Sequence, residues 1–128
     1  MRKRYISEEE KIKCKAVINV FQELYDKEDI IALTAGDYGI VVLQWYMKEH
    51  GFDSVTTFTN HLELYKYLRE QWWEYELFSR MEGTEWEEAD FETKYRNMEE
   101  KSQKELMEKR VFFWKLLLDN LMNSNIKI

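Results

Sequence analysis

The sequence predicts an α+β fold: a three-stranded antiparallel meander packed with three to four helices, in the order α-β-β-β-α-(α)-α. Residues 30–59 contain three apolar runs of strand length, rich in β-branched and aromatic residues and separated by glycine-containing turns. The flanking segments repeat apolar residues at spacings of three and four, the pattern of helices that bury one face. We therefore expect helices laid against a small sheet, in a single domain that spans residues 1–128.

The first helix is predicted to begin at Ser7, which has Glu10 three residues later, the arrangement of a capping box. Its apolar stripe predicts a helix that runs to about Tyr25 and covers one face of the sheet. Cys14 lies within this helix and is the one cysteine of the chain, so we interpret it as a small buried residue rather than a reactive thiol.

The three apolar runs predict strands at residues 29–35, 39–47 and 54–59. Gly36-Asp37 between the first two is typical of a hairpin turn, because glycine adopts the positive φ that such turns require. Gly39, just after the turn, indicates a bulge or the close approach of another backbone segment. In a strand, alternate residues point to opposite faces, and the second run is apolar at both sets of alternate positions. This pattern predicts a central strand covered on both faces.

Asn60, followed by Glu63, predicts the start of a second long helix of about twenty residues. Its expected core positions are Leu62, Tyr65, Leu68 or Arg69, Trp72, Tyr75 or Glu76, and Phe78. Neighbouring residues on a helix diverge by about 100°, so Trp72 and Trp73 point in different directions. We expect Trp73 to point outward, where it is a candidate contact for a partner.

The stretch at residues 82–92 has no basic residue and is the most acidic of the chain, with Glu82, Glu85, Glu87, Glu88, Asp90 and Glu92. It also carries the large aromatic residues Trp86 and Phe91. One interpretation is a solvated connector held by these two side chains, followed by a short helix over residues 91–98. The other is a recognition strip for a basic groove, in which the aromatic residues anchor the contact.

The last helix is predicted to begin at the capping box Ser102-Gln103-Lys104-Glu105 and to end at about Leu121. Its apolar residues extend almost around the helix, with Val111, Phe112 and Met122 outside the main stripe. Such a helix is buried within its domain or against another chain. A homodimer, or an interface with a different protein, through the helix that begins at Ser102 and ends at Leu121 is therefore one expectation.

The composition limits the classes of function. The formal net charge of −6 disfavours nonspecific binding to nucleic acid, which depends on neutralising phosphates with lysine and arginine. Apolar stretches of about twenty residues are missing, and polar and acidic residues follow the basic start, so we expect neither a membrane span nor a signal peptide. A cytoplasmic, aromatic-rich domain with no direct nucleic-acid contact is the resulting expectation.

No motif predicts a catalytic residue, a cofactor or a metal. His50 and His61 lack a second ligand at metal-binding spacing, and four scattered glycines do not build a phosphate-binding loop. An alternative to a binding protein is a ligand-binding or catalytic domain with a pocket between sheet and helices, lined by Tyr38, Trp45, Tyr46 and His50.

The segment Ala35-Gly36-Asp37-Tyr38-Gly39 precedes an apolar strand, and His50-Gly51-Phe52 and Thr57-Phe58-Thr59 precede an aromatic helix. This arrangement, over about residues 30–78, resembles small uncharacterised proteins encoded on mobile elements of gut Firmicutes. The resemblance implies no active site. It implies roles common among mobile-element cargo, such as inhibition of host defence systems by small, acidic, non-enzymatic binders.

These observations lead to one main functional hypothesis, a non-enzymatic acidic protein that docks on a protein partner and inhibits a nucleic-acid-handling or host-defence protein. The expected partner-binding residues are Trp73, Glu82, Glu85, Trp86, Glu87, Glu88, Asp90 and Phe91. Carboxylates would complement a basic groove and speed association, while a tryptophan anchors the contact. A ligand-binding or catalytic domain and a homodimeric regulatory or structural subunit are the alternatives.

Overall fold

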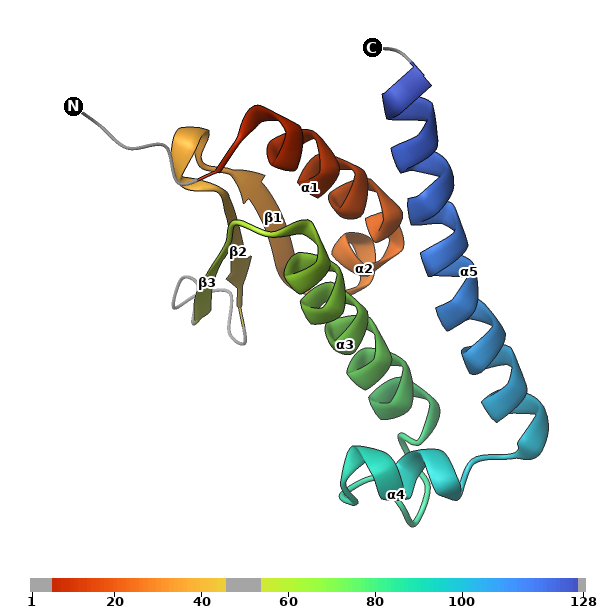
Figure 1. Cartoon of the computed structure of the whole chain (residues 1–128). Coiled ribbons are helices and arrows are strands. Elements are labelled where there is room, and N and C mark those ends of the chain that lie inside the picture. Colours follow the sequence, from red (N-terminus) through yellow and green to blue (C-terminus); the bar gives the residue numbers. More distant parts are fainter. Residues whose placement is uncertain (1–5, 46–53, 127–128) are drawn as a thin grey trace.

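The computed structural model describes residues 6–45 and 54–126 of the chain (Figure 1). Its elements follow in the order α1 (Glu8–Val20), α2 (Gln22–Lys27), β1 (Ile30–Thr34), the 3-10 turn η1 (Gly36–Tyr38), β2 (Ile40–Gln44), β3 (Ser54–Phe58), α3 (His61–Arg80), α4 (Phe91–Arg96) and α5 (Glu100–Ile126). The predicted α+β class and element order are confirmed, including the short helix after the acidic stretch.

The strands form an antiparallel meander in the order β1-β2-β3, with β2 in the centre as predicted. Val41 of β2 lies opposite Leu33 of β1 and Thr57 of β3, which fixes the register of the whole sheet. The first hairpin turns at Gly36-Asp37, the predicted position, and Ala35 closes it by donating its N–H to the Gly39 carbonyl at 2.8 Å.

Gly39 directly precedes β2 and lies against the backbone at the end of β3. Its φ is +110°, and a Cβ atom at this position would lie 2.4 Å from the carbonyl oxygen of Phe58. The expectation of a close backbone approach at this glycine is confirmed.

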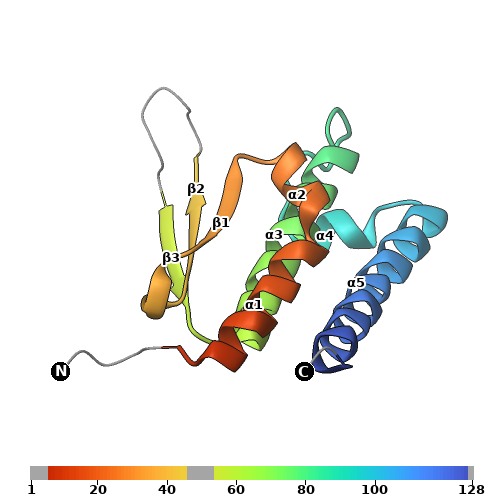
Figure 2. The same cartoon turned by 90° about the horizontal axis from the view of Figure 1, so that it is seen from above.

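The helices cover one face of the sheet, and the expectation that β2 is covered on both faces is wrong. Figure 2 shows three layers: the sheet, a middle layer of α1, α2 and α3, and α5 on the far side. Ile40 and Val42 face the middle layer and are fully buried. The opposite face carries no described helix, and its Leu33 and Val55 are 46% and 54% exposed. Apolar residues on both faces of β2 therefore do not mean that both faces of this strand are buried.

The predicted helix starts at Ser7 and Asn60 are confirmed by their hydrogen bonds. The Ser7 hydroxyl accepts the N–H of Glu10 at 3.1 Å, and the Asn60 side chain accepts the N–H groups of Leu62 and Glu63. Both side chains satisfy N–H groups that have no partner within the helix.

Three predicted helix boundaries are wrong. The first helix breaks at Phe21, where φ is −104° and ψ is 30°, and the buried Phe21 ring packs against Tyr65 and Phe113. The last helix begins at Glu100 rather than at Ser102 and continues to Ile126 rather than ending at Leu121. Glu99 provides the first helical carbonyl by accepting the N–H of Gln103 at 3.0 Å.

The core between the layers is built around aromatic rings. Trp72 of α3 is 1% exposed and meets the ring of Phe113 of α5 edge-on, with centroids 4.8 Å apart. Phe21 packs on Phe113 from the other side at 5.0 Å. Such edge-to-face and tilted pairs are favourable beyond the apolar area that they bury. Several of the many aromatic residues of the chain therefore pack α3, α5 and the α1–α2 junction together.

The predicted core face of α3 is confirmed at its middle positions and wrong at its two ends. The confirmed positions are Tyr65, Leu68, Trp72 and Glu76. Leu62 and Phe78, which were expected in the core, are 44% and 52% exposed, whereas Leu64 and Leu77 are fully buried. The reason is that α3 lies between the sheet and α5, so two partners on different sides select its buried positions. None of the described helices is both long and apolar enough to cross a membrane.

Candidate functional site

The acidic connector between α3 and α4 is a series of tight turns that hydrogen-bond to one another. The Thr84 hydroxyl donates to the Met81 carbonyl at 2.7 Å and accepts the Trp86 N–H at 3.1 Å. The Ala89 N–H then donates to the Trp86 carbonyl at 3.0 Å. These bonds fix the backbone turns of the connector, and the side chains of Glu82, Glu85 and Glu88 are exposed on them.

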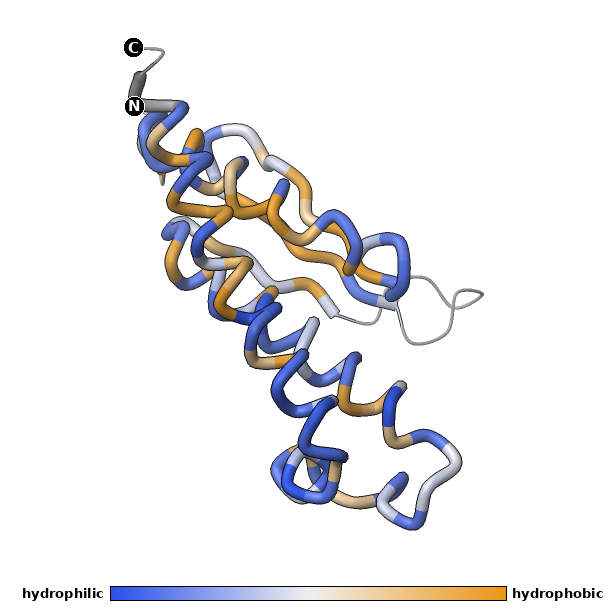
Figure 3. The backbone as a smooth tube through the Cα atoms, turned by 90° about the vertical axis from the view of Figure 1, so that its right-hand side faces the viewer, coloured by the Kyte–Doolittle hydropathy of each residue, from blue (hydrophilic) through white to orange (hydrophobic). Residues whose placement is uncertain are grey.

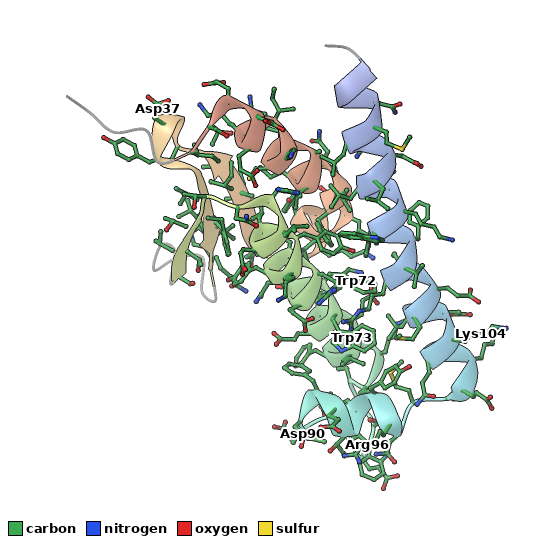
Figure 4. All side chains as sticks on the ribbon, in the orientation of Figure 1. Asp37, Trp72, Trp73, Asp90, Arg96 and Lys104 are labelled. Carbon is green, nitrogen blue, oxygen red and sulfur yellow. The ribbon has the colours of Figure 1, made fainter. Side chains whose placement is uncertain are left out.

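Asp90 ends the connector and begins α4. Its carboxylate accepts the Thr93 N–H at 2.7 Å, and this bond lowers the pKa of Asp90. The carboxylate also lies at the positive end of the helix. Figure 4 places Asp90 and Arg96 at the two ends of α4, at the extremity of the molecule farthest from the sheet. Asp90 therefore serves as a helix cap, in addition to its predicted place on the partner surface.

Carboxylates dominate this end of the molecule, which Figure 3 shows as largely hydrophilic. Four of them have no ion-pair partner among the described residues: Glu82, Glu85, Glu87 and Glu88. Two arginines that flank the connector are paired with other carboxylates. Arg96 reaches Glu92 at 4.0 Å, and Arg80 pairs with Glu76 at 3.2 Å and with Glu105 at 3.8 Å. The connector therefore presents negative charge that its own fold does not neutralise.

A hollow of about 540 Å³ lies between the connector and the start of α5. Trp86 and Met98 provide apolar lining, and Glu85 and Glu99 add carboxylates. Trp86 is half-buried in this arrangement and does not project freely into solvent. Met98 and Glu99 were not identified from the sequence, because they lie beyond α4 and the fold alone brings them back to Trp86.

A second aromatic surface lies beside the connector. Phe91 is 38% exposed, and the Lys94 ammonium lies 5.0 Å from its ring and 5.8 Å from the ring of Phe78. Lys94 is only 5% exposed, so its charge lies beneath the two rings rather than among the carboxylates. Phe78 was expected in the core and belongs instead to this surface.

Trp73 diverges from Trp72 as expected but is covered by the rest of the chain. Its ring packs on Tyr95 of α4 with centroids 5.1 Å apart, and the Arg110 guanidinium of α5 lies 5.0 Å from it. These contacts give Trp73 a role in holding α3, α4 and α5 together (Figure 4). Its assignment to the partner surface stays a prediction. We call the side chains of Glu82, Glu85, Trp86, Glu87, Glu88, Asp90 and Phe91 the acidic end surface.

Glu10, Cys14 and His61 lie close together where α1 meets the start of α3. Glu10 accepts the backbone N–H of His61 at 2.6 Å and pairs with its Nδ1 at 2.5 Å. Burial acts to raise the pKa of Glu10, but these hydrogen bonds outweigh it and hold the pKa below its ordinary value. Cys14 is fully buried, and burial, with the charge of Glu10, raises the pKa of its thiol to about 11. The thiol is therefore neutral at physiological pH, and the Glu10–His61 pair joins two helices.

The alternative pocket between sheet and helices is not assembled from the expected residues. Tyr38 and Trp45 lie at opposite ends of β2, and Tyr46 and His50 lie outside the described residues. Trp45 instead lines a hollow of about 320 Å³ with Tyr25, Glu28, Asp29 and Ile30. Burial, together with the charge of Asp29, raises the pKa of Glu28.

Two further apolar surfaces are open. One is the outer face of the sheet, which includes Ile31, Leu33 and Val55. The other is the side of α5 that faces away from the middle layer. Among its large apolar side chains Met122 has the highest exposed fraction, 62%.

Within residues 6–45 and 54–126, no three histidine, cysteine or acidic side chains gather closely enough to hold a metal ion. Comparison of the chain with known protein-family models, with curated proteins and with solved structures finds no match.

Proposed function

We propose that this protein is a non-enzymatic binding domain that docks on a basic surface of a protein partner through the acidic end surface. The observation that carries the proposal is a set of four carboxylates that have no ion-pair partner among the described residues. They lie on a connector whose turns are closed by hydrogen bonds, beside the half-buried Trp86. Preorganised groups of one charge steer a partner of opposite charge and lose little conformational entropy on binding.

The hollow beside Trp86 suits a lysine or arginine side chain of the partner. Trp86 and Met98 would contact its methylene groups, while Glu85 and Glu99 would face its positive charge. Arg80 also lines the hollow, but its guanidinium is already paired with Glu76 and Glu105. The contact would therefore combine an aromatic anchor with charge-assisted hydrogen bonds.

The mechanism is occlusion: the acidic end surface covers a basic groove and denies it to another ligand. Basic grooves are typical of proteins that handle nucleic acids, because they neutralise phosphates. Inhibition of a nucleic-acid-handling or host-defence protein is accordingly the role that we propose.

The test is capture of partners from a lysate of the host by the tagged protein, at low and at high salt, followed by mass spectrometry. We expect a specific partner at low salt that is lost at high salt, because salt screens contacts between exposed charges. The triple variant Glu85→Lys, Glu87→Lys, Glu88→Lys should lose this partner while its circular dichroism spectrum stays unchanged.

A matched control reverses three carboxylates on other elements, Glu9→Lys, Asp26→Lys and Glu63→Lys, which changes the net charge by the same amount. This control should retain the partner, and Trp86→Ala should weaken capture at every salt concentration. Undiminished capture by the connector triple variant would refute the proposal. Equal loss in both triple variants would show that net charge alone is responsible.

A further inference from the structure

The outer face of α5 is apolar and exposed along most of the helix. The exposed large side chains of α5 are Met107, Val111, Phe112, Trp114, Leu118 and Met122, with exposed fractions between 40% and 62%. Met107, Val111, Trp114 and Leu118 are separated by four, three and four residues, the spacing of the contact seam in a two-helix coiled coil. The buried residues Leu106, Phe113 and Leu117 lie on the other side of the helix, against the middle layer.

The charged residues on the same outer face carry both signs. Lys104, Glu108, Lys115 and Asp119 are among them, two positive and two negative side chains on a chain whose net charge is −6. All four are exposed, and none forms an ion pair with another side chain in the part of the chain that the structure describes. Figure 4 shows Lys104 extending away from the rest of the molecule. A strongly acidic or strongly basic partner would leave half of these charges unmatched.

The order of these charges is self-complementary when the helix is reversed. Lys104 lies as many residues before the midpoint between Val111 and Phe112 as Asp119 lies after it. Glu108 and Lys115 are related in the same way about the same midpoint. A second copy of α5, antiparallel to the first, would therefore place each lysine opposite a carboxylate, with Val111 of each copy opposite Phe112 of the other.

A parallel pair would have the opposite result. Each charged residue would then face its own counterpart, and like charges directly opposite each other destabilise a helix pair. We propose that the outer face of α5 is the interface of a homodimer in which the two α5 helices are antiparallel and centred between Val111 and Phe112. This inference is independent of the acidic end surface, which lies at the end of the molecule near α4.

The geometry of this dimer is testable with single cysteines. Val111 and its symmetry counterpart would be offset along the axis by roughly one helical rise of about 1.5 Å, whereas Leu118 and its counterpart would be offset by roughly 20 Å. Cysteines form a disulfide only when their Cα atoms lie within about 7 Å. With oxidised glutathione as oxidant, Val111→Cys should give a covalent dimer and Leu118→Cys should stay monomeric on a non-reducing gel. The native Cys14 is fully buried and serves as the background control in the unmodified chain.

Charge substitutions test the pairing itself. Sedimentation velocity over a range of concentrations should show a reversible dimer for the unmodified protein. Glu108→Lys or Lys115→Glu places like charges opposite each other twice in the dimer and should weaken association about tenfold. The double variant Glu108→Lys, Lys115→Glu, or an equal mixture of the two single variants, should restore it. Both positions are exposed, and an unchanged circular dichroism spectrum verifies folding.

A monomer at every concentration would overturn the proposal. A dimer that leaves Val111→Cys uncrosslinked would place the interface elsewhere, for example on the open face of the sheet. A dimer that crosslinks through Leu118→Cys would be parallel. A dimer whose affinity does not change with the charge substitutions would show that Glu108 and Lys115 do not pair across the interface.

Discussion

Substitution of Gly39 by alanine should destabilise the protein more than the same substitution at either of the other glycines that the structure describes, Gly36 and Gly83. With φ at +110° and ψ at −148°, Gly39 has a backbone conformation that is essentially restricted to glycine, and an L-residue there costs about 1–3 kcal/mol. The new Cβ would also lie 2.4 Å from the Phe58 carbonyl oxygen, so β3 would have to move away from the start of β2. We expect a total loss of about 3–5 kcal/mol in the free energy of unfolding.

Gly36→Ala is the matched control, because it adds the same methyl group to the same hairpin. Gly36 has a φ of +59°, in the left-handed region, but a Cβ there meets nothing within 4 Å. Its cost should be about 1 kcal/mol, from the backbone conformation alone. The contrast between the two variants therefore isolates the contact with Phe58.

The measurements are urea denaturation, which gives the free energy of unfolding, and thermal denaturation, which gives Tm, both followed by tryptophan fluorescence and far-UV circular dichroism. For a domain of this size 1 kcal/mol corresponds to a shift in Tm of about 4 °C, so Gly39→Ala should lower Tm by about 10–20 °C and Gly36→Ala by about 4 °C. Equal losses in the two variants would refute the reasoning. A smaller loss in Gly39→Ala than in Gly36→Ala would mean that β2 and β3 do not approach each other at this point.

Two other substitutions test contacts between helices. The carboxylate of Glu10 has a pKa below the ordinary value of 4.5, so its contribution is present above pH 4.5 and is lost as the pH falls through the lowered value. Glu10→Gln should therefore lower the free energy of unfolding by about 1–2 kcal/mol at pH 7 and reduce the loss of stability that the unmodified protein shows as the pH falls below 4.5. Glu9→Gln, the control, should lose stability with falling pH as the unmodified protein does. The same pH dependence in Glu10→Gln as in the unmodified protein would contradict this assignment. Trp73→Ala removes the stacking with Tyr95 and Arg110 and should cost about 2–3 kcal/mol in thermal unfolding. A loss of partner capture without any loss of stability would instead return Trp73 to the partner surface.

Part of the candidate site was accessible from the sequence. The lack of basic residues between Glu82 and Glu92 predicted an exposed acidic connector, and Trp86 stood out within it. The hollow was not predictable, because Met98 and Glu99 reach Trp86 only after α4 has reversed the chain. The sequence also suggested the last helix as an interface, but it did not separate the residues that pack on the core from those that stay exposed.

The sequence by itself determined the elements that depend on local interactions. Side-chain caps such as Ser7 and Asn60 act on N–H groups within three residues, and the glycines of the hairpin set a turn within five residues. These signals are complete in a short window, so the meander, its order and the helix starts at Ser7 and Asn60 were predicted correctly.

Only the tertiary structure decided which faces of these elements are buried. The apolar residues of β2 and α5 exceed what one packing face requires, and nothing local distinguishes Val41 from Val42 or Phe112 from Phe113. The distinction arises because the middle layer of helices lies between the sheet and α5. Val42 and Phe113 are buried, the latter against Trp72 and Phe21, whereas Val41 is half-buried and Phe112 is exposed. Burial is a property of the neighbouring element, and that neighbour lies too far along the chain for a local pattern to reveal it.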